Sequence, residues 1–95
     1  MSGLKVSCRR GAGSWSCDVT VGSDAGATRH EVTVEDATLR DLGAGAEAPD
    51  RLVEASFRFL LEREPRESIL RRFELSAIGR YFPEWREVMR AESTG

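Results

Sequence analysis

The sequence has no long apolar run and no excess of positive charge. No stretch approaches the roughly 20 apolar residues that a helix needs to cross a bilayer, and its first residues, MSGLKVSCRRGAG, lack the apolar segment of a secretory signal. We therefore expect a cytoplasmic protein without membrane contact. The 14 basic residues are outnumbered by 16 acidic ones, for a net charge of −2, so the chain is not a cationic module that binds nucleic acid by charge alone.

Cysteine and histidine are scarce as well, with two residues and one residue. Two thiols in a cytoplasmic protein are expected to stay free rather than to form a bridge. The glycine runs GAGS and GAGA are typical of turns and linkers, and neither matches a phosphate loop or a dinucleotide fingerprint. No acidic pair indicates acid/base chemistry, so we predict a protein that is not an enzyme and needs no cofactor.

The composition itself is that of a small globular protein. The 95 residues are 40% hydrophobic and 32% charged, an ordinary balance for a folded chain of this size. No internal repeat or low-complexity tract interrupts it. We expect a single domain over residues 1–95.

The first third of the chain alternates polar and apolar residues with a period of two, which is typical of half-buried strands. Turn sequences, GAGS and GSDAGAT, separate the alternating segments. If the turns centre on these sequences, Cys8 lies opposite Cys17 and Val19 opposite His30, and every apolar side chain shares one face. The pattern predicts a three-stranded antiparallel β-meander, with strands over about 4–10, 14–22 and 28–35.

Helical periodicity follows the strands. The longest helical segment carries one narrow polar stripe, and its apolar remainder is wider than the roughly 100° that packing on a sheet alone requires. We therefore expect this helix to contact both the sheet and a second element. The fold class predicted is α+β in two layers, with helices packed on one face of the meander, over about 36–42, 49–64, 66–73, 76–82 and 83–91.

The broad apolar surface of the 49–64 helix and the aromatic C-terminal third predict a contact surface. Six of the seven aromatic residues follow residue 56, and full burial of such a side chain is worth about 1.5–3 kcal/mol. If the chain cannot cover them, a second subunit or another protein would. We predict a non-catalytic protein-interaction or regulatory module, self-associating or binding another protein, with candidate contact residues Phe57, Phe59, Leu61, Tyr81, Phe82 and Trp85.

The segment ILRRFELSAIGRYFPEW, residues 69–85, raises an alternative, because its layout resembles the turn of a helix-turn-helix. A recognition helix presents several polar side chains to the major groove. Between Ser76 and Pro83 this segment offers under two turns, with Arg80 as the basic side chain. A nucleic-acid-associated regulator is therefore the second hypothesis, and a core-forming helical hairpin is the simpler interpretation.

A third possibility involves Cys8, Cys17 and His30, which the predicted registers place together. Thiolates and imidazole are zinc ligands, but no fourth ligand is visible and the face they share is apolar. A disulfide between the cross-strand cysteines is geometrically possible. We expect instead two buried free thiols that act as small apolar side chains, and no metal.

The run FLLEREPRESILRRFELSAIGRYFPEW, residues 59–85, resembles a stretch of small bacterial proteins of unknown function, and the preceding HEVTVED is similar to the same pattern. The likeness covers about two-thirds of the chain. It implies a bacterial origin and brings no activity or site residues. A meander followed by a helix also resembles HicB-type antitoxin domains, at the level of fold only.

Overall fold

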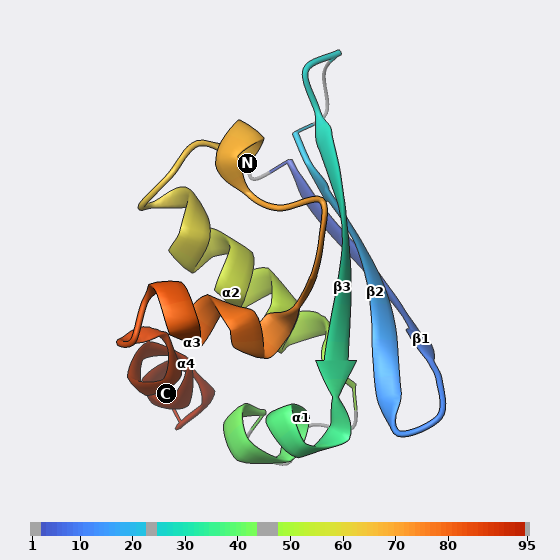
Figure 1. Ribbon diagram of the computed structural model, residues 1–95, viewed down its shortest axis with the longest axis vertical. Helices are drawn as coiled ribbons and strands as arrows, with labels where there is room; N and C mark the ends of the chain where they lie inside the picture. The colour runs from blue at the N-terminus through green and yellow to red at the C-terminus, as the bar shows by residue number, and fades with distance from the viewer. Residues whose placement is uncertain (1–2, 23–24, 44–47, 95) are drawn as a thin grey trace.

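The structure, a computed structural model, describes residues 3–22, 25–43 and 48–94. Four strands form one sheet in the order β1-β2-β3-β4, and the helices lie together on one of its faces (Figure 1). The fold is therefore α+β in two layers. In chain order the elements are β1 (Leu4–Arg10), β2 (Ser14–Val21), β3 (Thr28–Glu35), α1 (Asp36–Leu42), α2 (Asp50–Leu61), η1 (Arg66–Ser68), β4 (Arg72–Glu74), η2 (Leu75–Ala77), α3 (Ile78–Tyr81) and α4 (Trp85–Thr94).

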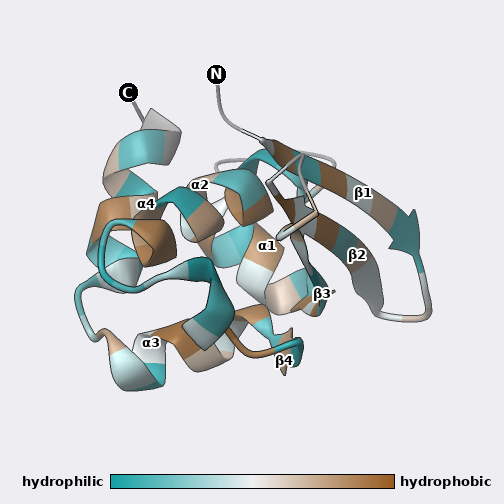
Figure 2. Ribbon diagram, turned by 90° about the horizontal axis from the view of Figure 1, so that it is seen from above, coloured by the Kyte–Doolittle hydropathy of each residue, from teal (hydrophilic) through white to brown (hydrophobic). Residues whose placement is uncertain are grey.

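Strands β1 to β3 form the predicted antiparallel meander. Cys8 lies opposite Cys17, and Val19 lies opposite His30, as the alternation requires. Polar and apolar residues alternate along β1 and β2 (Figure 2). Because side chains in a strand point alternately to opposite faces, this pattern places the apolar set against the helices and leaves the polar set on the open face.

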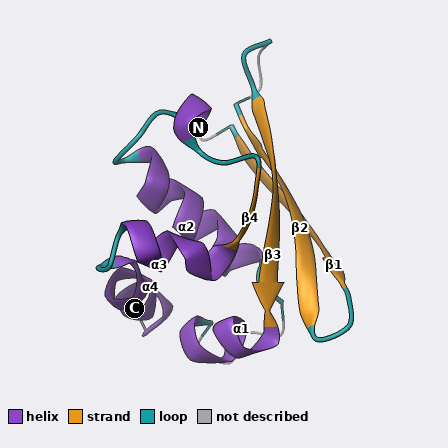
Figure 3. Cartoon of the chain, in the orientation of Figure 1, coloured by secondary structure: helices purple, strands orange, loops and turns teal. Residues whose placement is uncertain are grey.

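The prediction of three strands and of a helix over 66–73 is wrong. Only Arg66–Ser68 is helical, as one 3-10 turn, and the chain then extends into β4, which pairs parallel with β3 (Figure 3). The Glu31 N–H donates to the Arg71 carbonyl at 2.7 Å. Pairing in this way satisfies backbone groups at the edge of β3, which a helix at this position would leave without partners.

Three other helix boundaries also differ from the prediction. The 49–64 helix spans Asp50–Leu61, with Pro49 at the N-cap. The 76–82 helix is a 3-10 turn from residue 75 followed by α3, and the 83–91 helix is α4, which runs from Trp85 to Thr94. Pro65 and Pro83 account for the earlier ends of the 49–64 and 76–82 helices. Proline disfavours helix at the residue before it and cannot donate a backbone hydrogen bond.

Helix α2 packs on the sheet with one side and on α4 with the other, as its wide apolar surface predicted. Its side chains Phe57, Phe59 and Leu60 are buried by the chain itself. The condition under which a second subunit is expected, that the chain cannot cover this helix, is therefore not met for these three side chains. The helical layer supplied by the C-terminal third performs that role.

A buried polar contact joins α2 to α4. The Trp85 indole N–H donates to Ser56 Oγ at 3.0 Å, and Ser56 Oγ lies 3.5 Å from Met89 Sδ. All three residues are almost completely buried. A buried indole N–H needs an acceptor, so Ser56 allows Trp85 to enter the core without an unsatisfied donor.

We expect Ser56→Ala to lower the free energy of unfolding by about 1–3 kcal/mol, because it leaves the Trp85 indole N–H without its acceptor. Urea unfolding followed by circular dichroism measures this loss. In a Trp85→Phe background, which has no indole N–H, the same Ser56→Ala change should cost much less. An equal cost in both backgrounds would show that the hydrogen bond contributes nothing.

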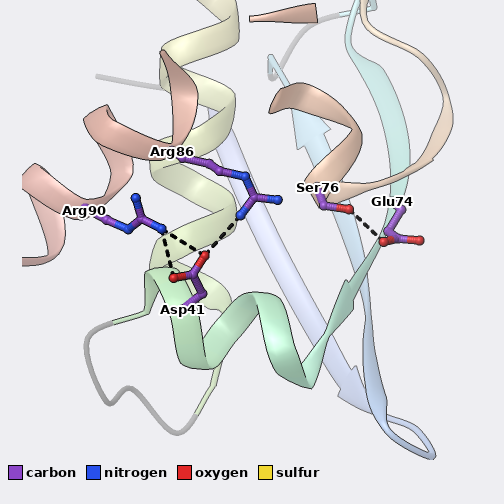
Figure 4. A network of polar contacts seen from close by, with 5 residues as sticks. All are labelled: Asp41, Glu74, Ser76, Arg86 and Arg90. Atoms are coloured by element: carbon purple, nitrogen blue, oxygen red, sulfur yellow. Dashed lines mark hydrogen bonds and ion pairs between the residues drawn. The ribbon is translucent and has the colours of Figure 1, made fainter. Parts of the chain in front are cut away.

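An exposed ionic contact ties α1 to α4 on the other side of the helical layer. Asp41 accepts from Arg86 Nη1 at 3.1 Å and from Arg90 Nη2 at 3.0 Å (Figure 4). Exposed ion pairs contribute little to stability, so this contact adds little to the cohesion of the helical layer. Two of the arginines of residues 71–90 are thereby engaged within the chain.

Candidate functional site

An apolar pocket of about 420 Å³ lies between the end of α2, the segment leading into β4, and α3. Its size lies within the range of about 300–1,000 Å³ that is typical of ligand pockets. Most of its wall is apolar. The lining residues are Leu60, Glu64, Ser68, Ile69, Leu70, Phe73, Ala77, Ile78, Tyr81 and Phe82.

The first wall of the pocket is the segment between Pro65 and β4. Ile69 turns inward and is 5% exposed, whereas its neighbour Leu70 is 55% exposed. His30 fixes this segment, because its Nδ1 lies 2.8 Å from the Leu70 carbonyl oxygen and its Nε2 lies 2.9 Å from Thr28 Oγ1. A carbonyl only accepts, so the Nδ1–H donates to the Leu70 oxygen, and Nε2 shares a hydrogen bond with the Thr28 hydroxyl.

The second wall is α3 with the turn before it. Ile78 is buried and anchors the wall to the core, while Tyr81 is 70% exposed at the pocket rim. Phe82 closes one end by edge-to-face contact with Phe59, with ring centroids 5.7 Å apart. Leu70 and Tyr81 are thus two large side chains exposed to solvent beside an apolar pocket. Exposed apolar side chains of this kind are typical of interaction sites.

The pocket also carries a few polar groups. Glu64 contributes a carboxylate, and Ser68 and Tyr81 contribute hydroxyls. An apolar wall with a small number of polar groups is typical of sites that bury an apolar ligand and orient it by hydrogen bonds or charge.

The structure separates the six predicted contact residues into two groups. Phe57, Phe59 and Trp85 are at most 3% exposed, so they belong to the chain's own core, and their assignment to a contact surface is wrong. Tyr81 and Phe82 line the pocket, and Leu61 is 36% exposed outside its lining. Aromatic content alone cannot distinguish the buried residues from the exposed ones, because both kinds occur in segments with helical spacing after residue 56.

Several pocket residues were missed from the sequence. The helix predicted over 66–73 includes Leu70 and Phe73, whereas in the extended segment observed there they line the pocket. Glu64 was counted within the long helix, which ends at Leu61. The signal that could have found them is Pro65, since a break after proline permits an extended return to the sheet edge.

The expectation of two free thiols is wrong. Cys8 and Cys17 form a disulfide across β1 and β2, with Cα atoms 4.0 Å apart. The backbone of β1 bonds to β2 at Gly3 and Gly11, and by alternation at the odd-numbered residues between them, so the cysteines are a non-hydrogen-bonded pair. Side chains of such pairs approach closely, which favours a bridge.

The same bridge removes the thiolates from the zinc candidate Cys8, Cys17 and His30. His30 in addition uses both ring nitrogens in hydrogen bonds. In the described part of the chain, no group of three or more His, Cys, Asp or Glu residues could hold a metal ion. His30 acts here as a structural residue, packed on the Phe57 ring at 5.4 Å between centroids.

The helix-turn-helix layout is not formed as that hypothesis requires. Helix α3, at the position of the recognition helix, has four residues. Ile78 faces the core, and Tyr81 lies over the pocket. A helix of this length presents too few side chains to read a major groove.

Across the ranges that the structure describes, none of the helices combines the length and the apolar character that a membrane span requires.

Electrostatic contacts distant from the pocket fasten the hairpin of β1 and β2 to α1. Arg10 Nη2 donates to Asp36 Oδ2 at 2.8 Å, and Nη1 donates to Oδ1. This bidentate hydrogen bond lowers the pKa of Asp36. Next to it, a shared hydrogen bond with Glu74 raises the pKa of Glu35, while the Ser76 hydroxyl, which donates to Glu74 at 2.7 Å, lowers the pKa of Glu74.

We expect Asp36→Asn to weaken the acid dependence of stability. A carboxyl with a lowered folded pKa stabilises the fold above the ordinary aspartate pKa, and this contribution disappears as the pH falls through the lowered value. The melting temperatures of wild type and variant should differ at neutral pH and converge in acid. Glu35, whose pKa is raised, has the opposite dependence in both proteins and cancels in the comparison. Arg10→Gln should reproduce the convergence; a constant difference at all pH values would contradict the assignment.

Comparisons of the chain with models of known protein families, with curated proteins and with solved structures find no match.

Proposed function

We propose that this protein is a non-catalytic interaction module whose apolar pocket receives side chains of a protein partner. The observation that carries the proposal is the pairing of a 420 Å³ apolar hollow with two exposed large side chains, Leu70 and Tyr81, at its rim. Burial of such side chains in a complex is favourable by about 25 cal/mol for each Å² removed from water. Exposed apolar side chains around a hollow are typical of binding surfaces.

The state of the reactive side chains supports binding rather than catalysis. His30 has both ring nitrogens in hydrogen bonds, and Cys8 is bonded to Cys17. A general base or a nucleophile must be free to take a proton or to attack. The pocket lining instead combines aliphatic and aromatic side chains, which suit recognition of an apolar segment.

Selection of a random peptide library on the immobilised protein tests this proposal. Selected peptides should bind a Leu70→Asp/Tyr81→Asp variant much more weakly than the wild type, because both changes place charge at the pocket rim without disturbing buried residues. Leu61→Asp is the matched control, since Leu61 is exposed but lies outside the pocket lining. Peptides that bind wild type and both variants equally would place the interaction elsewhere and reject the pocket.

Self-association is a second candidate, and the free edge of β1 is the observation that favours it. By the hydrogen-bond alternation, Leu4, Val6, Cys8 and Arg10 direct their backbone groups away from β2. On the inner face the first three of these side chains are half-buried, whereas their partners on β2 are buried. A second copy that pairs β1 with β1 would satisfy these groups and cover these side chains.

Sedimentation velocity over a range of concentrations tests this second candidate. Val6→Pro removes only a backbone donor that faces outward, so the ladder with β2 stays intact. A dimer in wild type and in Val6→Ala that is lost in Val6→Pro would support pairing through this edge. A monomer at all concentrations would exclude it and leave the pocket proposal unaffected.

A further inference from the structure

We infer that a lysine or arginine side chain of the protein partner enters the pocket, because such a side chain combines an apolar stem with a positive charge. This inference rests on the proposed function. The observation is the placement of Glu64. It lines a mostly apolar pocket, and its N–H donates to the Leu60 carbonyl at 2.9 Å, which holds residue 64 against the end of α2.

The Glu64 carboxylate is available to a ligand. Within the described ranges, its side chain makes no hydrogen bond or ion pair. The neighbouring Arg63 is engaged elsewhere: its guanidinium lies 3.6 Å from the Phe59 ring centroid, and its Nη1 donates to the Phe59 carbonyl at 3.0 Å. Arg66 approaches Glu67 at 3.4 Å.

The surroundings of Glu64 leave its negative charge uncompensated. The pocket lining contains no lysine, arginine or histidine. The site also adjoins the C-terminal end of the 12-residue helix α2, where the helix dipole adds a negative potential that favours cations. Carboxylate and helix end therefore act in the same direction, toward a ligand cation.

The apolar wall strengthens this preference. A ligand that carries its cation at the end of an apolar chain displaces water from around Glu64 when it enters the pocket. An ion pair is stronger where water is excluded. The Ser68 and Tyr81 hydroxyls at the same site can accept hydrogen bonds from an ammonium or guanidinium group. An anionic ligand of the same shape would meet the same carboxylate and be repelled.

Three probes of one shape separate charge from apolar contact: 4-phenylbutylamine, 4-phenylbutanol and 4-phenylbutanoate. Each is titrated at neutral pH into the isotope-labelled protein, and the backbone amide signals of Ala77 and Ile78 report occupancy of the pocket. We expect the amine to bind about two- to fivefold more tightly than the alcohol, the range for a partly exposed ion pair. The carboxylate should bind more weakly than either.

Glu64→Gln keeps the shape of the side chain and removes its charge, so the amine and the alcohol should bind this variant equally. Glu67→Gln is the matched control, because it removes the same charge from a side chain that is 68% exposed outside the pocket; it should keep the preference for the amine. Loss of the preference in Glu64→Gln alone supports the inference.

The outcomes distinguish this inference from the proposed function. Equal binding of amine and alcohol to the wild type, or an amine preference that persists in Glu64→Gln, overturns the cation preference and leaves an apolar pocket. If none of the three probes shifts the Ala77 and Ile78 signals at millimolar concentration, the inference and the pocket proposal both fail.

Discussion

Phe57→Ala is expected to destabilise the protein by about 3–5 kcal/mol, the cost of removing an aromatic ring from a close-packed core. Phe57 is completely buried, and its ring packs between His30 and Phe73, with centroids at 5.4 and 6.0 Å. It therefore joins α2 to β3 and β4. Urea unfolding followed by circular dichroism measures the loss, which is a large share of the roughly 5–15 kcal/mol that stabilises a domain of this kind.

Tyr81→Ala is the matched control, because it removes another aromatic side chain from the helical layer. Tyr81 is 70% exposed, so its removal should change the free energy of unfolding by no more than about 0.5 kcal/mol. If the two substitutions had similar effects, the distinction between core and pocket rim would be wrong. The comparison thus tests the division of the predicted contact residues directly.

Loss of the Cys8–Cys17 disulfide is expected to cost about 2.5–3 kcal/mol, as estimated from the entropy of closing a short loop. The bonded residues are nine positions apart, so the bridge restricts only a small part of the unfolded chain. Reductant should lower the free energy of unfolding of the wild type by this amount, and the urea midpoint with it. A Cys8→Ala/Cys17→Ala variant should start from the lower midpoint and not respond to reductant.

Thiol titration of the unfolded, unreduced protein provides the direct control. No free thiol is expected before reduction and two are expected after it. Two reactive thiols in protein purified without reductant would show that the bridge does not form. In that case β1 and β2 would be held by backbone hydrogen bonds and side-chain packing alone.

Local pattern explains why the meander could be predicted. In a strand, a shift of one residue moves every side chain to the opposite face, so the apolar set of β1, β2 and β3 permits few registers. The register that pairs Cys8 with Cys17 is the one observed. Helix α1 was likewise predicted over its observed range, because its leucines recur at helical spacing before Gly43, which caps it.

The disulfide shows the limit of such reasoning. The alternation places the two cysteines opposite each other, but thiols of a cytoplasmic protein, the compartment that the sequence predicts, are expected to stay free. In the structure they occupy a non-hydrogen-bonded pair with Cα atoms 4.0 Å apart. Closeness of that kind depends on the hydrogen-bond phase of the ladder, which side-chain alternation does not encode.

The candidate site was the least predictable part, because it is built from segments that meet only in three dimensions. Leu60 and Glu64 come from the end of α2, Leu70 from the return to the sheet, and Tyr81 from α3. A short apolar run is compatible with helix or strand. In the 66–73 segment the extended conformation is formed where residues 72–74 pair with the edge of β3.

The sequence by itself determined the one-sided sheet, its registers and the need for a helical cover, since period-two and period-3.6 patterns are local properties of the chain. Tertiary structure alone decided which aromatic side chains are buried and which stay wet, and it created β4 and the pocket beside it. The physical reason is that burial and parallel pairing depend on which segments, distant in sequence, pack against each other. The local periodicity of the sequence does not specify those contacts.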